Sequence, residues 1–275
     1  MRAVSDRAGA AGAVLAAAML LATGGASAQD NTLQEIERYR QMLQDGNPAE
    51  LLVVRGEELW KTKRGPKNAS LEQCDIGLGP GVVKGAYARL PRYFADVDQV
   101  MDFEARLVHC MVTLQGFDRG ALVKSPFSGA GQRQTDIESI TTFVVEQSRG
   151  ASVAVPQNHP KEKAAFDRGK QLFYMRAGPY DFACSTCHGV DGQRIRLQDL
   201  PNFEKPEPAQ RAFATWPAYR VSQGALRTMQ WRINDCFRQQ RWPEPIFISQ
   251  GTIDLITFLG VKAAGGKMDS PAIKR

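Results

Sequence analysis

Metal-ligating side chains are scarce in this 275-residue sequence, which contains three histidines and five cysteines. His109 and His159 are isolated, and no second Cys-x-x-Cys pair accompanies the one formed by Cys184 and Cys187. A zinc site needs two further nitrogen or sulfur ligands beside such a pair, so the pattern argues against zinc. The sequence also lacks a glycine-rich phosphate loop and a Ser, His and Asp set, which are the signals of nucleotide binding and of a serine hydrolase.

Long apolar runs are missing as well, since no stretch beyond the N-terminus is apolar enough to cross a bilayer. The formal net charge is +6, but the basic residues are spread along the chain without the dense block of a nucleic-acid-binding protein. We therefore expect neither a membrane span nor a nucleic-acid partner. The charge could favour an anionic substrate, although a solvated surface is the simpler explanation.

The N-terminus has the three parts of a secretory signal peptide. Arg2 and Arg7 give it a basic start, residues 8–22 are small and apolar, and Ala26-Ser27-Ala28 matches a cleavage site. The apolar run is too short for a membrane span, and polar sequence follows it. We predict that residues 1–28 are removed after Ala28 and that the chain is exported to a bacterial periplasm or an equivalent oxidising compartment.

The run Cys184-Ser185-Thr186-Cys187-His188 is typical of a c-type haem attachment site. Its two thiols can add to the haem vinyl groups, and the adjacent histidine then lies under the iron as the proximal ligand. A redox-active dithiol is the alternative for a Cys-x-x-Cys pair, but it makes no use of a histidine in the fifth place. We predict one covalently bound haem c, held by Cys184 and Cys187, with His188 as an axial ligand.

The sequence repeats itself at two constant offsets. Residues 55–60 (RGEELW) precede residues 168–173 (RGKQLF) by 113 positions, and after the haem motif the offset becomes 126. Several matches in the same order at shared offsets indicate two copies of one domain. The matches at the two offsets include Leu71 with Cys184, Cys74 with Cys187, Asp75 with His188, Tyr93 with Tyr219, Arg106 with Arg232, and Cys110 with Cys236.

Each copy is expected to begin and end with a helix. In the second copy, Phe166, Gly169 and Phe173 share one face of a helix that opens near Pro160. A second helix closes the copy, with Thr252 as its N-cap. A glycine such as Gly169 has no side chain and lets the backbone of another helix approach closely.

Two helices that cross over a haem loop are the basis of a cytochrome c domain. We therefore predict an all-α protein with two tandem cytochrome c-like domains, of which only the second binds haem. The length fits two domains of about 120 residues each. The predicted boundaries are residues 29–150 for the first domain, 151–160 for a linker, and 161–275 for the haem-binding domain.

The first copy lacks two of the residues that attach haem. It has Leu71 in place of a thioether cysteine and Asp75 in place of the proximal histidine. Its own cysteines, Cys74 and Cys110, would face one collapsed haem pocket, so in an oxidising compartment we expect a disulfide between them. This bond would close a loop of about 36 residues and contribute roughly 3–4 kcal/mol in the chain-entropy model. The alternative is a pair of buried free thiols.

The sequence offers two kinds of residue for the distal side of the iron. An electron-transfer cytochrome c usually supplies methionine there, for which Met229 and Met268 are available. The rival is Cys236, which has no cysteine left to pair with once the haem motif has used its two. A buried cysteine on a surface helix, or a disulfide to a partner, is the alternative role for Cys236.

Arginines surround Cys236 in sequence. Arg232 lies one helical turn before it, and Arg238 and Arg241 follow it. Guanidinium groups next to a thiol are expected to lower its pKa, which favours metal binding by the thiolate. The same groups can hold a small dianion by forked, charge-assisted hydrogen bonds. We therefore take Arg232 and Arg241 as candidate substrate-binding residues.

The haem motif, the R-x-x-x-C-x-x-x-x-R segment from Arg232 to Arg241 and the duplicated layout together resemble the SoxA subunits of thiosulfate-oxidising SoxAX cytochromes. The resemblance covers essentially the whole mature chain. It implies that Cys236 is the distal haem ligand and the catalytic cysteine, found as a persulfide, and that Arg232 binds substrate. Because Leu71 and Asp75 depart from members with two haems, the chain is similar to the single-haem form, in which a disulfide is expected.

The reaction implied by this resemblance joins thiosulfate oxidatively to a cysteine of a separate sulfur carrier, the SoxYZ complex. Formation of the new S–S bond releases two electrons, which pass through haem to a cytochrome c acceptor. Because one haem iron takes one electron at a time, a small cytochrome partner of the SoxX type is expected to supply a second haem. A simple electron carrier with His/Met ligation, and a subunit that only relays electrons for another catalytic chain, are the alternatives.

Overall fold

A computed structural model of the chain describes residues 34–35, 38–39, 42, 45–195 and 198–274. Residues from Asn47 onward form one compact unit, which contains the named helices and strands. The predicted signal peptide, residues 1–28, lies outside the described residues. Within the described part, every helix is too short or too polar to span a membrane.

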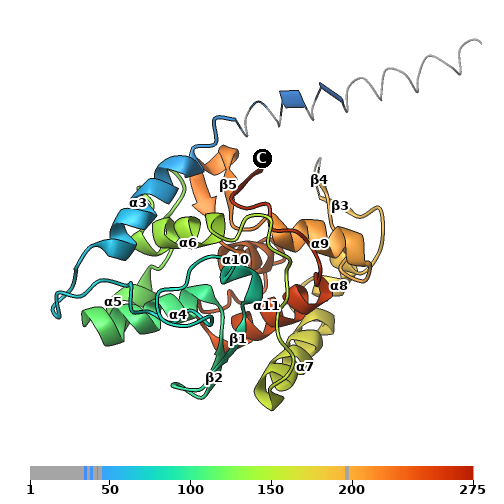
Figure 1. The fold of residues 1–275 in the computed structure, drawn as a ribbon. Coiled ribbons are helices and arrows are strands. Elements are labelled where there is room, and N and C mark those ends of the chain that lie inside the picture. The colour runs from blue at the N-terminus through green and yellow to red at the C-terminus, as the bar shows by residue number, and fades with distance from the viewer. Residues whose placement is uncertain (1–33, 36–37, 40–41, 43–44, 196–197, 275) are drawn as a thin grey trace, which may run out of the picture. The chain divides into compact units, whose positions relative to one another are not determined.

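Two long helices cross at a glycine in the first half of this unit (Figure 1). They are α3 (Ala49–Lys61) and α6 (Asp136–Glu146). A Cβ atom placed on Gly56 would lie 2.0 Å from the carbonyl oxygen of Ser139 and 2.8 Å from the Cβ of Phe143. No side chain can occupy such distances, so the two helix backbones touch at Gly56.

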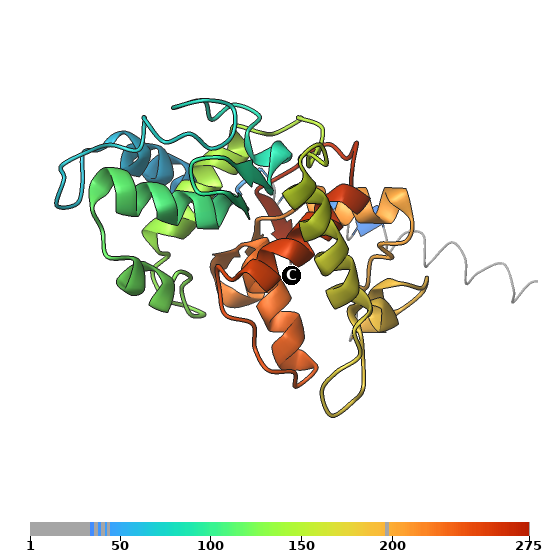
Figure 2. The same cartoon turned by 90° about the horizontal axis from the view of Figure 1, so that it is seen from below.

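The second half repeats this crossing with α7 (Pro160–Tyr174) and α11 (Gln250–Lys262). A Cβ atom on Gly169 would lie 2.0 Å from the carbonyl oxygen of Asp254 and 2.9 Å from the Cβ of Phe258. The close approach predicted at Gly169 is therefore confirmed. Figure 2 shows the first helix pair on one side of the unit and the second pair on the other.

The start of α11 differs from the prediction. The N-cap is Ser249, so Thr252 lies inside the first turn and the prediction of Thr252 as the cap is wrong. The physical reason is that the Thr252 hydroxyl contacts Ser249 Oγ at 3.1 Å and the Ile246 carbonyl at 3.4 Å, and does not cap a helix N–H group. The start of α7 agrees better, since Pro160 is its first residue and the His159 side chain caps it.

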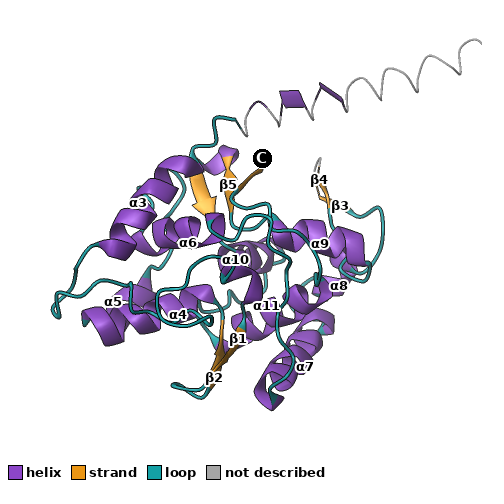
Figure 3. Ribbon diagram, in the orientation of Figure 1, coloured by secondary structure: helices purple, strands orange, loops and turns teal. Residues whose placement is uncertain are grey.

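Short strands correct the all-α expectation, although helices dominate (Figure 3). The antiparallel hairpin of β1 (Arg92–Phe94) and β2 (Gln99–Met101) runs directly into α4 (Phe103–Cys110). At a distance of 126 residues along the chain, the hairpin of β5 (Ala218–Arg220) and β6 (Ala225–Arg227) runs into α10 (Met229–Gln239). The repeat seen in the sequence thus includes the positions of these strands, the register in which they pair, and the first residue of the helix that follows each hairpin.

The remaining elements are short connections around these two sets. They are η1 (Tyr87–Arg89), η2 (Met111–Gln115), α5 (Arg119–Lys124), α8 (Cys184–His188), β3 (Arg194–Ile195), β4 (Gln198–Asp199), α9 (Pro206–Ala214), η3 (Val221–Gln223) and β7 (Ala272–Lys274). The last of them, β7, pairs in parallel with β5 and extends that hairpin to a three-stranded sheet.

The segment predicted as a linker, residues 151–160, is bonded on both sides. The backbone N–H of Val153 donates to the carbonyl of Gly266 at 2.8 Å, and the N–H of Ala154 donates to the carbonyl of Ala88 at 2.8 Å. The Val153 side chain is buried. The segment therefore packs against residues of both halves. It is part of the interface between the two halves, which we call the seam.

Buried polar contacts across this seam fix β6 and α10 against the first half. The guanidinium of Arg227 donates to the carbonyl of Ser128 at 2.5 Å and lies 3.5 Å from the carboxylate of Glu138. The N–H of Leu226 donates to the side chain of Gln134 at 2.9 Å. Because a buried charge is stable only when it is paired, this network holds the hairpin in one place.

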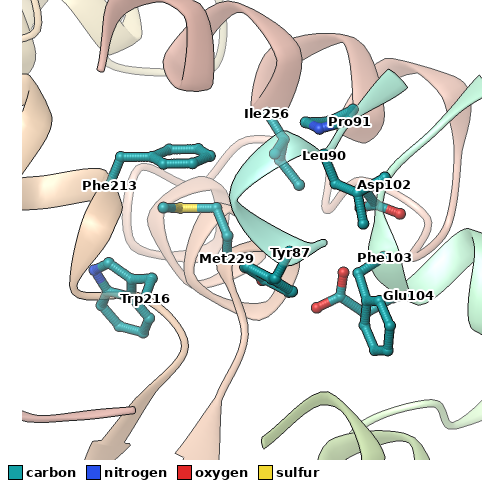
Figure 4. A pocket seen from close by; sticks show the side chains of 10 residues that line it. All are labelled: Tyr87, Leu90, Pro91, Asp102, Phe103, Glu104, Phe213, Trp216, Met229 and Ile256. Atoms are coloured by element: carbon teal, nitrogen blue, oxygen red, sulfur yellow. The ribbon is translucent and has the colours of Figure 1, made fainter. Parts of the chain in front are cut away.

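A small cavity lies in the same seam and has room for about one water molecule. The Glu104 side chain lines this cavity, and its carboxyl oxygen Oε1 is buried without a hydrogen-bond partner. Burial, together with the charge of Asp102, raises the pKa of Glu104 well above its ordinary value. Figure 4 shows the lining residues, which are Tyr87, Leu90, Pro91, Asp102, Phe103, Glu104, Phe213, Trp216, Met229 and Ile256.

Candidate active site

The haem motif forms the short helix α8, and its histidine is held by a backbone carbonyl. The Nδ1 atom of His188 lies 2.9 Å from the carbonyl oxygen of Pro201. Because a carbonyl can only accept, Nδ1 carries the proton and the lone pair of Nε2 is left to bind a metal. Burial lowers the pKa of His188, which keeps the ring neutral, as a metal ligand must be.

Cys236 and Arg232 lie one turn apart on α10, and a buried carboxylate orders the arginines around them. Asp235 is 5% exposed. It accepts hydrogen bonds from Arg232 Nη1 at 2.9 Å, from Arg238 Nη2 at 2.6 Å and from Gln239 Nε2 at 2.8 Å. One carboxylate therefore faces two guanidiniums, and it holds Arg232 in a fixed position beside the cysteine.

Helices α8 and α10 bring their functional residues to one place. Burial raises the pKa of Cys184 to about 12, and the charge of the nearby Cys236 adds to this effect. The charge of Arg232 lowers the pKa of His188 further, after burial. The charges of Cys236 and Arg232 thus act on residues of the haem motif.

The pKa of Cys236 itself differs from the prediction. Burial raises it, and this outweighs the lowering by the charges of Arg232 and Arg220. The expectation of a lowered pKa in the free thiol is therefore wrong. Desolvation of the thiolate raises the pKa by more than the two guanidiniums lower it.

The two methionines that compete with Cys236 are both buried. The Met229 side chain lines the seam cavity near Phe213 and Trp216 (Figure 4). Met268 is 2% exposed, and its backbone pairs with Gly150 and Ala151.

Arg241 is not brought beside Cys236 in the same way. It is exposed, has a positive φ of 56°, and lines a shallow surface hollow together with Ile195, Arg238 and Gln239. The structure thus separates the two arginines predicted to bind substrate, with Arg232 half-buried at the cysteine and Arg241 at the surface.

The structure adds Arg220, at the end of β5, which the sequence interpretation missed. Its Nε atom is buried without a hydrogen-bond partner. Burial and the charge of Arg232 lower its pKa, while the charges of Asp235 and Cys236 raise it. The match of Tyr219 with Tyr93 pointed to this strand, but Arg220 itself falls opposite Phe94 in the repeat and gave no signal.

The equivalent place in the first half is closed. Cys74 and Cys110 form a disulfide with their Cα atoms 5.7 Å apart, which confirms the predicted bond. Leu71 is fully buried, and Asp75 accepts hydrogen bonds from the N–H groups of Gly77 and Gly79. These residues offer no imidazole and no free thiol, so they do not fit a covalently attached haem.

The second half fits such a group. Cys184 and Cys187 are free thiols, and His188 has its Nε2 available. Large apolar side chains around the motif are exposed to solvent, as expected where a flat apolar cofactor would cover them. These side chains are Tyr174, Met175, Tyr180, Phe182 and Val190.

Comparisons with known proteins identify the family. The family model of the SoxA/TsdA cytochrome c domain matches residues 55–153. The L-cysteine S-thiosulfotransferase subunit SoxA of Hydrogenophilus thermoluteolus is 52% identical over 243 residues, 88% of each chain. The subunit of the same name from Hydrogenobacter thermophilus is 31% identical over 266 residues, 94% of this chain and 96% of the relative.

A solved structure shares the fold. The crystal structure of SoxXA from P. pantotrophus matches with a TM-score of 0.70 at 22% identity, over 86% of this chain and 84% of the other. The fold, the cytochrome c domain and the identity to curated relatives over most of their length lead to one conclusion. The chain belongs to the SoxA family of L-cysteine S-thiosulfotransferase subunits.

Proposed function

We propose that this chain is the c-type cytochrome subunit that joins thiosulfate to a cysteine of a sulfur-carrier protein of the SoxYZ type. The observation that supports the proposal is that the charge of Cys236 acts on Cys184 of the haem motif, and that the charge of Arg232 acts on both His188 and Cys236. A simple electron carrier has no use for a free cysteine next to an ordered guanidinium.

One haem c belongs to the second half in this proposal. Cys184 and Cys187 would hold it by thioether bonds, and His188 and Cys236 would bind its iron. When bound, the haem supplies a one-electron acceptor next to the reacting sulfur. The first half is a second cytochrome c-like domain without haem, in which the Cys74–Cys110 disulfide takes the structural role of the cofactor.

The site residues have separate tasks. Arg232, fixed by Asp235, presents its remaining N–H donors to the sulfonate oxygens of thiosulfate. Cys236, as a thiol or as a persulfide, marks the place where the outer sulfur of thiosulfate reacts. A new S–S bond forms between that sulfur and the carrier cysteine thiolate, and the product is a cysteine S-thiosulfonate. Two electrons are released in this step.

The release of two electrons implies a partner. One haem iron accepts one electron at a time, so we propose a small cytochrome of the SoxX type as the second subunit and a soluble cytochrome c as the final acceptor. We place the complex in the periplasm, where the predicted signal peptide would deliver it. The Cys74–Cys110 disulfide supports an oxidising compartment.

The test uses the purified holoprotein with its partner cytochrome, the carrier and thiosulfate. We expect the carrier to gain one thiosulfonate group by mass spectrometry and two equivalents of cytochrome c to be reduced. Cys236→Ser should abolish both. The control is Arg211→Gln, which removes an exposed arginine paired with Glu207 on α9. Full activity in Cys236→Ser, or a methionine-type near-infrared band in the wild type, would leave a simple electron carrier instead.

A further inference from the structure

Arg220 and Arg232 form a pair of guanidiniums that the fold has no evident structural reason to bring together. Arg220 ends β5, and Arg232 lies in the first turn of α10, which follows the paired strand β6. The charge of each arginine lowers the pKa of the same cysteine, Cys236. Like charges close together in a half-buried place are unfavourable unless an anion lies between them.

The first half shows how the same position is balanced by the protein's own residues. By the offset of 126, Phe94 takes the place of Arg220 and Arg106 the place of Arg232. There the guanidinium of Arg106 lies over the Phe94 ring, 4.2 Å from its centre, and donates to the carboxylate of Asp96 at 2.7 Å. At the same offset Ser222 takes the place of Asp96, so the second half replaces the ring by a guanidinium and lacks the carboxylate.

Charge at the site is not balanced by the protein. Asp235 is the carboxylate that acts on Arg220, and it is already bonded to Arg232 and Arg238. Among the described residues Arg220 makes no ion pair, and its Nε is buried without a partner. Asp235 is therefore the one carboxylate in the described part of the chain that acts on the three guanidiniums of Arg220, Arg232 and Arg238, and this leaves an excess of positive charge.

We propose that Arg220 binds the substrate anion together with Arg232, as a second guanidinium of the site at Cys236. The ligand class is a small sulfur oxyanion with two negative charges, and this assignment rests on the proposed function. Arg220 supplies unused N–H donors, whereas Arg232 has part of its donor set taken by Asp235.

The experiment compares Arg220→Gln, Arg220→Lys and the control Arg211→Gln in the holoprotein with its partner cytochrome. Thiosulfate is the probe, in steady-state kinetics with the carrier and in calorimetric binding without it. Loss of a charge-assisted contact should raise the KM and the Kd roughly 10- to 100-fold in Arg220→Gln. Arg220→Lys keeps the charge but loses the fork, so it should fall between Arg220→Gln and the wild type.

Haem propionates are the other source of negative charge near this site. If Arg220 served them, Arg220→Gln would change the haem spectrum or the midpoint potential and leave the Kd for thiosulfate unchanged, which would overturn the proposal. An unchanged Kd with an unchanged haem would overturn it as well. If Arg220→Gln does not fold, Arg220→Lys decides in the same way. If the wild type and Arg220→Gln conjugate thiosulfate equally well, only the role of Arg220 is refuted. If the wild type does not conjugate thiosulfate at all, the proposed function is refuted.

Discussion

The carboxylate of Asp102 accepts a hydrogen bond of 2.5 Å from the side-chain amide of Gln230, across the seam between the two halves. Asp102 also caps α4 through the N–H of Ala105, and Gln230 accepts the N–H of Ile248 at 2.7 Å. Both side chains are buried. The helix that carries Cys236 is therefore oriented by a residue of the half that lacks the haem motif.

Stability should fall as the pH rises, because of the acid pair in this seam. Burial raises the pKa of Asp102 to about 6 and that of Glu104 well above its ordinary value. The folded state therefore keeps protons that the unfolded state loses above about pH 4, so the free energy of unfolding decreases from there up to each folded-state pKa. Glu104→Gln should stabilise the protein by about 1–3 kcal/mol at pH 8 and much less at pH 5.

The measurement is thermal unfolding of the wild type and Glu104→Gln at both pH values. The control is Glu57→Gln, which changes an exposed carboxylate paired with Lys61. A difference between variant and wild type that is the same at pH 5 and pH 8 would contradict the prediction.

The helix crossing in the second half should not tolerate a methyl group. Gly169→Ala places a Cβ atom 2.0 Å from the Asp254 carbonyl, so the helices must separate, at a cost of about 3 kcal/mol or more. Gly251→Ala on α11 is the matched control, since its Cβ would meet nothing closer than 3.9 Å. Chemical denaturation should show a large loss for the first and little change for the second. Equal midpoints would show that the crossing is not tight.

The disulfide of the first half should contribute to stability without affecting haem. Replacing Cys74 and Cys110 by serine together opens a loop of 36 residues, and we expect a loss of roughly 3–4 kcal/mol. Intact-mass analysis of the wild type should show one haem and two hydrogens fewer than the reduced chain. The double variant should retain the haem. A second haem in the mass would contradict the assignment to one half.

Arg232→Ala should weaken the use of thiosulfate. Asp235 keeps its bonds from Arg238 and Gln239, so the fold of α10 is preserved. Loss of a charge-assisted contact is expected to raise the KM about 10- to 100-fold. The haem spectrum should stay nearly the same. An unchanged KM and rate would remove Arg232 from the binding site.

The repeat in the sequence predicted more of the fold than the composition did. The glycine before an apolar pair predicted the backbone contact at Gly169, and the leftover cysteines predicted the disulfide of Cys74 with Cys110. The hairpins were missed because strands of three residues are too short to show an alternating pattern.

The candidate site was predicted in part. Sequence distance placed Arg232 and Arg241 on either side of Cys236, but the chain leaves the helix before Arg241, which is therefore exposed. Arg220 lies 16 positions before Cys236, and its charge acts on Cys236 across a strand pair that the sequence did not reveal. The pKa of Cys236 depends on burial, which a local sequence motif does not contain.

In the repeat, Cys74 and Cys110 stand where Cys187 and Cys236 stand in the second half, but the first pair is bonded and the second pair is free. If the second pair were to form the same bond before haem is attached, Cys187 would be lost as a thioether donor. We therefore expect maturation to require that haem attachment precede oxidation of these two thiols.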